Sequence, residues 1–359
     1  MKDISSGYFY GKLYNKKERY PWNGEIEFTY RCNLNCIHCY CEGLEDKDKE
    51  LDTFQWKKIL DEIQDEGCLW LTITGGEPLI RDDFLEIYSY AKAKGFIITL
   101  FSNGLLLTEK IIDYLQKSPP ESIEITLNGI TKTTYEDITQ VKGSFERVVS
   151  IIKELADKNL PLILKSNCLR KNKGEIGRIK RWTDGLLGKG HKRWRFKYDW
   201  MIYPRLNGDT APCDYRLSPD ELLEVKKSDP EIWEEYERGL CGRFPEFGRD
   251  RKFLYQCNAW VNHFFINPYG RLKFCQFSDK FSVDLRKQSF REGFYNVFPQ
   301  LLKGKFKTDS RCKDCSLRPI CYCCPARAFL ETKDEEASVE YFCEVAKATL
   351  KDMKLLVRP

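Results

Sequence analysis

The stretch TYRCNLNCIHCYCEG, residues 29–43, places three cysteines in one short loop with the spacing C-x3-C-x2-C. A strand-like run, EIEFTY (25–30), leads directly into it, so the loop should lie at the carboxyl end of a strand. Folds that alternate strands and helices place their active sites at that end of the sheet. Thiolates at Cys32, Cys36 and Cys39 are soft ligands that suit zinc or an iron–sulfur cluster. The loop therefore predicts a metal site in an α/β fold.

Two kinds of metal site fit this loop. Three thiolates would hold three irons of a [4Fe–4S] cube and leave the fourth iron open to a ligand, much as a catalytic zinc keeps one position free. Alternatively, Cys41 or His38 would complete a structural zinc knuckle. The loop alone leaves both open.

The composition favours metal or redox chemistry for the cysteines. The 359 residues are 42% hydrophobic and include 16 cysteines. The chain starts without an apolar signal segment, and no stretch approaches the roughly 20 apolar residues of a membrane span, so we expect a cytoplasmic protein without a membrane partner. Disulfides are rare in that compartment. A net charge of +5 does not by itself demand a nucleic-acid partner.

Strand-like and helical patterns alternate up to about residue 205. The strand-like runs are rich in β-branched and aromatic residues and are EIEFTY (25–30), LWLTIT (69–74), FIITLF (96–101), SIEITL (122–127), LILKSN (162–167) and WRFKYD (194–199). The expected helices span 53–67, 82–95, 108–117 and 144–158. This order predicts a parallel sheet, either doubly wound or bent into a partial barrel.

The pattern changes after this point. A loop rich in Pro, Gly and Asp is followed by a charged helical piece (218–239), and from Cys257 onward the chain is short-stranded and dense in cysteine. We expect that last part to be held by something other than a large apolar core. The predicted division is an N-terminal tail (1–20), a barrel (21–205), a bridging segment (206–255) and a cysteine-rich domain (256–359).

A second motif follows the second expected strand. In TITGGEPLIRDDF (72–84), Gly75 and Gly76 would let the backbone approach a ligand closely, and the Glu77 carboxylate would suit an ammonium group. The two glycines alone would favour an ordinary strand–helix turn. One strand after the cysteine loop, however, this motif favours a ligand site shared by both.

With both motifs, residues 22–199 resemble the radical S-adenosylmethionine (SAM) superfamily. The resemblance implies a partial (β/α)6 TIM-like barrel in which Cys32, Cys36 and Cys39 hold a [4Fe–4S] cluster whose open iron chelates SAM. It implies further SAM contacts at Tyr40, His38, Gly75, Gly76, Glu77, Pro78, Ser102, Asn103, Thr126 and Asn128. Thr126 and Asn128 depart from the usual Ser and Asp. Thr139 stands where some relatives have an arginine for the SAM carboxylate, so that contact is not assigned.

The tail resembles the SPASM extension of radical SAM enzymes, which carries auxiliary [4Fe–4S] clusters. By position, the outer cluster would be held by Cys312, Cys315, Cys321 and Cys343, and the inner one by Cys257, Cys275 and either Cys323 or Cys324. The run C-Y-C-C-P departs from the usual spacing and leaves that last choice open. Cys241 or an open site would complete the inner cluster. Without the upstream motifs, CKDCSLRPICYCC (312–324) would favour a zinc ribbon.

The resemblance implies an oxidoreductase that cleaves SAM to a 5′-deoxyadenosyl radical and oxidatively crosslinks a ribosomally synthesised peptide. It would need a low-potential electron donor of the flavodoxin or ferredoxin type. Because residues 1–20 are too short for a leader-binding domain, a separate leader-binding protein or the basic segment 169–197 would recognise the peptide. Asp199 and Tyr198 are candidates for proton transfer.

Three alternatives stay open at this point. A sulfatase-type protein maturase and a tetrapyrrole-modifying enzyme share the same cofactors. A zinc-ribbon protein that binds nucleic acid is the alternative from another class, and its support is the basic, Trp-containing segment 169–197. A solvated helix face explains that segment about as well.

Overall fold

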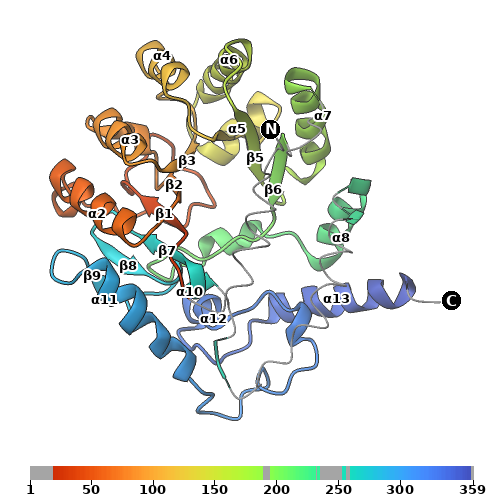
Figure 1. The fold of residues 1–359 in the computed structure, drawn as a ribbon. Coiled ribbons are helices and arrows are strands. Elements are labelled where there is room, and N and C mark those ends of the chain that lie inside the picture. Colours follow the sequence, from red (N-terminus) through yellow and green to blue (C-terminus); the bar gives the residue numbers. More distant parts are fainter. Residues whose placement is uncertain (1–18, 189–194, 232, 235–252, 256–258, 357–359) are drawn as a thin grey trace, which may run out of the picture.

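The computed structural model describes residues 19–188, 195–231, 233–234, 253–255 and 259–356, and six parallel strands form its centre (Figure 1). They are β1 (Asn23–Glu27), β2 (Trp70–Thr74), β3 (Ile97–Ser102), β4 (Ser122–Thr126), β5 (Leu162–Asn167) and β6 (Phe196–Asp199). Each strand pairs with the next in chain order. The six predicted strands are therefore confirmed, with boundaries that shift by at most three residues.

Helices cover the outer face of this curved sheet (Figure 1). The four expected helices are confirmed as α2 (Thr53–Asp65), α3 (Phe84–Ala93), α4 (Glu109–Lys117) and α6 (Ser144–Asp157). Two others, α5 (Lys132–Thr139) and α7 (Ile176–Leu187), were not predicted. Asp52 caps α2 in a full capping box, and Trp56 of that helix packs its ring 5.0 Å from Phe28. Apolar side chains of this kind join helices and sheet into one core.

The C-terminal part of the chain continues the same sheet. Strand β7 (His263–Ile266) lies parallel to β1, and β8 (Arg271–Lys273) and β9 (Val283–Asp284) follow as antiparallel strands. Gly24 allows this pairing, because a β-carbon there would lie 2.7 Å from an atom of the Phe264 ring. The pairing crosses the expected boundary at residues 255/256, and the proposed division into domains stays a prediction.

Part of the tail also shares the main apolar core. Phe290 of α11 (Phe290–Glu292) packs 4.7 Å from the Phe264 ring and 5.6 Å from Phe294, and all three are fully buried. The expectation of a tail without a large apolar core is therefore wrong for this stretch. It packs against the barrel instead of forming a core of its own, a long-range contact that local composition does not reveal.

The remaining named α-helices of the described residues are α8 (Pro219–Lys227), α10 (Ala259–Asn262), α12 (Pro325–Thr332) and α13 (Glu340–Leu356). The charged helix expected at 218–239 is thus shorter where it is described, and most of 232–239 lies outside the described residues. A buried bidentate pair from Arg216 to Glu331, at 3.0 and 2.8 Å, ties the bridging segment to α12. Among the described residues, no helix combines the length and apolar character that crossing a bilayer requires.

Candidate active site

The cysteine loop and the carboxyl ends of the strands enclose a cavity of about 480 Å³, here called the barrel cavity. The sequence-predicted residues that line it are Cys32, Cys36, Cys39, His38, Tyr40, Gly75, Gly76, Ser102, Asn103, Thr126, Asn128, Tyr198 and Asp199. The structure thus brings together predicted residues from the ends of four strands, β2, β3, β4 and β6, and from the loop after β1. Glu77 and Pro78 do not line the cavity.

Close main-chain packing holds the glycine motif against the cysteine loop. Gly76 N donates to Thr29 O at 2.7 Å, and Glu77 N donates to Arg31 O at 2.9 Å. A β-carbon on Gly76 would lie 2.6 Å from Tyr30 O and closer still to Arg31 O. Gly75 has a φ of +131°, which side-chain-bearing residues rarely adopt. Both glycines are therefore required for the end of β2 to reach the loop.

The Glu77 carboxylate does not line the cavity and forms hydrogen bonds within the surrounding protein. It accepts hydrogen bonds from Asn103 N at 2.7 Å, Leu79 N at 3.1 Å and Ser102 Oγ at 3.0 Å, and the residue is 0% exposed. Burial raises the pKa of this carboxyl to about 7. Its oxygens are engaged by the ends of β2 and β3, so in this structure Glu77 is a positioning residue and not a cavity contact.

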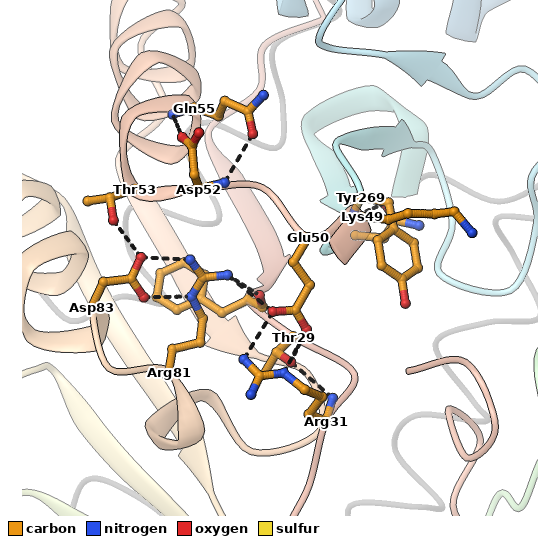
Figure 2. A network of polar contacts seen from close by, with 12 residues as sticks. Thr29, Arg31, Lys49, Glu50, Asp52, Thr53, Gln55, Arg81, Asp83 and Tyr269 are labelled. Carbon is orange, nitrogen blue, oxygen red and sulfur yellow. Dashed lines mark hydrogen bonds and ion pairs between the residues drawn. The ribbon is translucent and has the colours of Figure 1, made fainter. Parts of the chain in front are cut away.

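A buried network of charges fixes the start of the cysteine loop from the other side (Figure 2). Glu50 accepts from Arg31 at 3.2 and 3.1 Å and lies 3.5 Å from Arg81. Arg81 forms a bidentate pair with Asp83 at 2.8 and 2.7 Å, and Thr53 donates to Asp83 at 2.6 Å. The network joins both motifs to the first turn of α2, which limits movement of the loop.

The loop thiols Cys32, Cys36 and Cys39 are half-buried, and Cys41 is buried. Leu34 N donates to Cys32 Sγ at 3.4 Å, Asn103 Nδ2 lies 3.6 Å from the same sulfur, and Cys39 Sγ lies 3.5 Å from Cys41 Sγ. Burial raises the pKa of Cys32 to about 11. In the part of the chain that the structure describes, no three His, Cys, Asp or Glu side chains are close enough together to share a single metal ion.

The sequence profile of the radical SAM superfamily matches residues 26–176, which contain the cysteine loop, the glycine motif and strands β2 to β5. The chain carries a radical SAM domain. The family uses a [4Fe–4S] cluster and SAM. The enzyme prediction is confirmed, and the alternative of a zinc-ribbon nucleic-acid-binding protein is set aside. The basic segment 169–197 was the main support for that alternative. Part of this segment forms α7 on the outside of the radical SAM barrel, so it supports the alternative less.

Two relatives extend the likeness beyond the radical SAM domain. AdoMet-dependent heme synthase of Methanosarcina barkeri is 26% identical over 86% of this chain and 92% of its own length. The subtilosin biosynthesis protein AlbA of Bacillus subtilis is 26% identical over 79% of this chain, which spans 61% of AlbA. The crystal structure of Streptococcus suis SuiB bound to its precursor peptide SuiA has a TM-score of 0.72 at 16% identity, over 93% of this chain and 78% of SuiB. The likeness of fold to SuiB therefore extends over most of the chain.

The barrel cavity of the radical SAM domain fits a polar ligand such as SAM. Four of its lining side chains carry a buried atom that has no hydrogen-bond partner in the described residues. These atoms are His38 Nδ1, Glu124 Oε2, Tyr135 Oη and Tyr198 Oη. Leaving such atoms unpaired is costly unless a ligand or water pairs with them. Three thiols, two close glycine backbones and these atoms give a donor set suited to a cluster and SAM.

His38, Tyr198 and Asp199 lie on the same side of the cavity, near the end of β5. His38 Nε2 lies 3.3 Å from Asn167 Oδ1, and burial lowers the pKa of His38 to about 4, so the imidazole is neutral at pH 7. Asp199 Oδ1 accepts from Met201 N at 2.9 Å, which caps the turn after β6, and burial raises the pKa of Asp199. A role for Tyr198 and Asp199 in proton transfer stays a prediction.

Sequence reasoning missed four charged residues inside the barrel. Glu25, Glu124, Lys165 and Lys197 line the cavity from β1, β4, β5 and β6. Lys197 pairs with Glu124 at 2.6 Å, whereas Lys165 Nζ lies 3.0 Å from the centre of the Phe101 ring. The signal was present in the alternation of EIE, SIEIT and LKSN. Polar residues at every second position of strands covered by helices indicate a polar barrel interior.

Cysteines of the tail fall into two groups. A pocket of about 360 Å³ is lined by Cys312, Cys315, Cys321, Cys323, Cys324 and Cys343. Cys275 does not line this pocket, whereas the next two residues, Gln276 and Phe277, line the barrel cavity. Burial is the main cause of the raised pKa of Tyr203 and of Tyr255, and both Cys275 and Cys324 add to it at each ring. These two thiols therefore share one neighbourhood. Cys241 and Cys257 lie outside the described residues.

We expect Lys165→Met to stabilise the protein at low pH. Burial lowers the pKa of Lys165 to about 7 from 10.5, so below pH 7 the folded state carries a costly buried charge. Between pH 7 and 10.5 only the unfolded chain holds that proton, so wild-type stability rises with pH and the advantage of the variant shrinks. The expected gain at pH 6 is on the order of 3 kcal/mol.

Urea unfolding of wild type and variant in the same cluster-loaded form, at pH 6, 8 and 10, measures this gain. Lys153→Met, at an exposed position of α6, is the matched control and should change little at any pH. A pH-independent difference for Lys165→Met would show that this amine is not perturbed.

Proposed function

We propose that this chain is a radical SAM oxidoreductase that cleaves SAM reductively and oxidatively crosslinks a ribosomally synthesised peptide. The observation that carries the proposal is the convergence of Cys32, Cys36, Cys39 and the Gly75–Gly76 backbone on one polar cavity. When bound, the cluster and SAM supply a 5′-deoxyadenosyl radical that removes hydrogen from the substrate. The relatives AlbA, named for the biosynthesis of the bacteriocin subtilosin, and SuiB, solved with its precursor peptide, support a peptide substrate.

The residues of this chain have distinct roles in the proposal. Cys32, Cys36 and Cys39 hold the cluster, and the backbone of Gly75 and Gly76 meets the amino end of SAM. Ser102, Asn103, Thr126, Asn128, His38 and Tyr40 line the remaining SAM surface. Glu77 and the Glu50 network keep the two motifs together.

The wall between the barrel cavity and the tail supports an oxidative outcome. Tyr203 and Phe277 line the cavity with ring centres 4.2 Å apart, and Arg327 Nη2 donates to Tyr203 Oη at 3.1 Å. Cys275 and Cys324 lie close to Tyr203 and Arg327. We propose that these cysteines belong to the inner auxiliary cluster, and that Cys324 and not Cys323 is its ligand. A cluster there would accept an electron from a substrate radical through this wall.

Two partners complete the proposal. A flavodoxin- or ferredoxin-type protein would supply the electron for SAM cleavage. Peptide recognition would use a separate leader-binding protein or a surface of this chain.

A tetrapyrrole substrate is the second candidate, because the heme synthase of Methanosarcina barkeri matches over 86% of this chain. A sulfatase-type protein substrate remains a third. All three share the SAM chemistry and differ in the molecule that enters the barrel cavity.

Co-expression with short open reading frames that neighbour the gene, followed by mass spectrometry, tests the peptide proposal. We expect one peptide to lose two hydrogens, because a substrate radical that gives up an electron becomes an electrophile that a thiol, amine or aromatic carbon can trap. Fragmentation must then show that two residues are linked, since oxidation of serine to an aldehyde loses the same mass. If the peptides are unaltered while a porphyrin precursor or a sulfatase is altered, the proposal of a peptide substrate is overturned. The proposal of SAM cleavage is not affected by that result.

A further inference from the structure

A second cavity, larger than the barrel cavity, lies between the tail and the loops that follow β1 and β6. Its volume is about 1020 Å³, and its lining comes from six separate stretches of the chain. Apolar side chains line much of it, including Leu44, Leu206, Leu254 and Phe306, together with Phe329, which is 46% exposed. Six lysines also line it, at 273, 280, 303, 305, 307 and 333. We call this cavity the lysine groove.

Four of the six lysines in the groove form no ion pair with a described residue. Lys273 pairs with Asp279 at 3.0 Å, and Lys280 pairs with Glu335. Within the described residues, the exposed side chains at 303, 305, 307 and 333 have no ion-pair partner within 4.0 Å. The groove therefore presents positive charge above an apolar floor.

The two other acidic residues of the groove, Asp334 and Glu336, accept hydrogen bonds from main-chain N–H groups. Glu336 accepts from Lys307 N at 2.7 Å and from Thr308 N at 2.9 Å, and Asp334 accepts from Glu336 N at 2.9 Å. These bonds hold the loop that carries the lysines, and they leave the carboxylates turned toward main-chain donors. Counting the six lysines against Asp279, Asp334, Glu335 and Glu336, the groove keeps a net charge of +2.

The lysine groove adjoins the barrel cavity at one side chain. Phe277 lines both, and its ring lies 4.2 Å from Tyr203 and 6.3 Å from Tyr40, which line the barrel cavity. A chain bound in the groove would thus end beside the cavity where the radical is formed. The groove is also built from the tail, so the tail would contribute to substrate binding as well as to electron transfer.

We propose that the lysine groove binds an acidic, partly apolar segment of the peptide substrate and delivers the adjoining residues past Phe277 to the barrel cavity. This inference rests on the proposed peptide substrate and adds its chemistry: carboxylates for Lys303, Lys305, Lys307 and Lys333, and apolar side chains for the floor around Phe306. The inference places recognition of the peptide in the lysine groove of this chain and not in segment 169–197.

Fluorescence anisotropy with full-length, cluster-loaded protein tests the groove without any SAM turnover. The probe is a short fluorescein-labelled peptide of alternating glutamate and leucine. The Lys303→Glu/Lys305→Glu/Lys307→Glu variant should bind it at least about tenfold more weakly than wild type. The control, Lys110→Glu/Lys117→Glu/Lys153→Glu, has the same net charge and changes exposed lysines on α4 and α6, and it should lose less than about threefold.

Two further measurements keep the test decisive. The milder triple change of the groove lysines to Gln removes charge without reversing it and should also weaken binding. A lysine–leucine peptide of the same length should not bind wild type. Equal losses in the groove and control variants, or no loss in the Gln variant, would overturn the inference. Because binding is read directly, failure of the co-expression test would not be mistaken for failure of the groove.

Discussion

Replacing Cys32, Cys36 and Cys39 together by alanine is expected to abolish formation of 5′-deoxyadenosine from SAM. The three thiols line one cavity with the Gly75–Gly76 backbone, and they are its proposed cluster ligands. Without them no iron is held where SAM would be reduced. Anaerobically reconstituted protein with dithionite and SAM, followed by chromatography of the nucleosides, measures the loss.

The control for this variant is Cys68→Ala. Cys68 is buried just before β2, at the opposite end of the strand from the glycine motif, and does not line the barrel cavity. It should keep wild-type SAM cleavage. A triple variant that still forms 5′-deoxyadenosine would refute the assignment of the loop, and so would a wild-type protein that binds only zinc.

The same triple variant is expected to remain brown, because the proposed auxiliary clusters use tail cysteines and none of the loop cysteines. Within that variant, a further Cys324→Ala change should remove the inner cluster, whereas Cys323→Ala should leave the iron content nearly unchanged. The physical reason is position: Cys324 and Cys275 lie near Tyr203 and Tyr255, while Cys323 lies among Cys321, Cys312 and Cys324.

Iron analysis and Mössbauer spectra of the triple variant and of the two quadruple variants decide this. A colourless triple variant would make the tail a zinc domain. If the added Cys323→Ala change removes iron and the added Cys324→Ala change does not, Cys323 and not Cys324 is the ligand of the inner cluster.

The barrel was predictable because local sequence patterns indicate its strands and helices. The strand LILKSN and the helix expected at 53–67 depend on residues a few positions apart, and each was placed to within two residues. Pairing of β7 with β1 joins residues about 240 positions apart and depends on Gly24 making room for Phe264. No local pattern reports such a contact, so the tail was expected to stand apart from the barrel.

The candidate site was likewise predictable where short motifs carry it and not where distant residues come together. The residues carried by short motifs, Cys32 to Cys39 and Gly75–Gly76, were found from the sequence and share one cavity. The direction of the Glu77 side chain was not predictable, because it depends on donors from β3. The charges inside the barrel were overlooked because strands such as EIE and LKSN were interpreted only as strands. Alternation also shows which face is polar, and here that face is the interior.

Electron–nuclear double resonance on the dithionite-reduced wild-type protein tests whether SAM binds to the proposed cluster. With SAM labelled by ¹⁵N at its amino group, we expect a nitrogen coupling to the cluster that is absent from the Cys32/Cys36/Cys39 alanine variant. A wild-type spectrum that SAM leaves unchanged, with no nitrogen coupling, would contradict the claim that the barrel cavity holds SAM on an open iron.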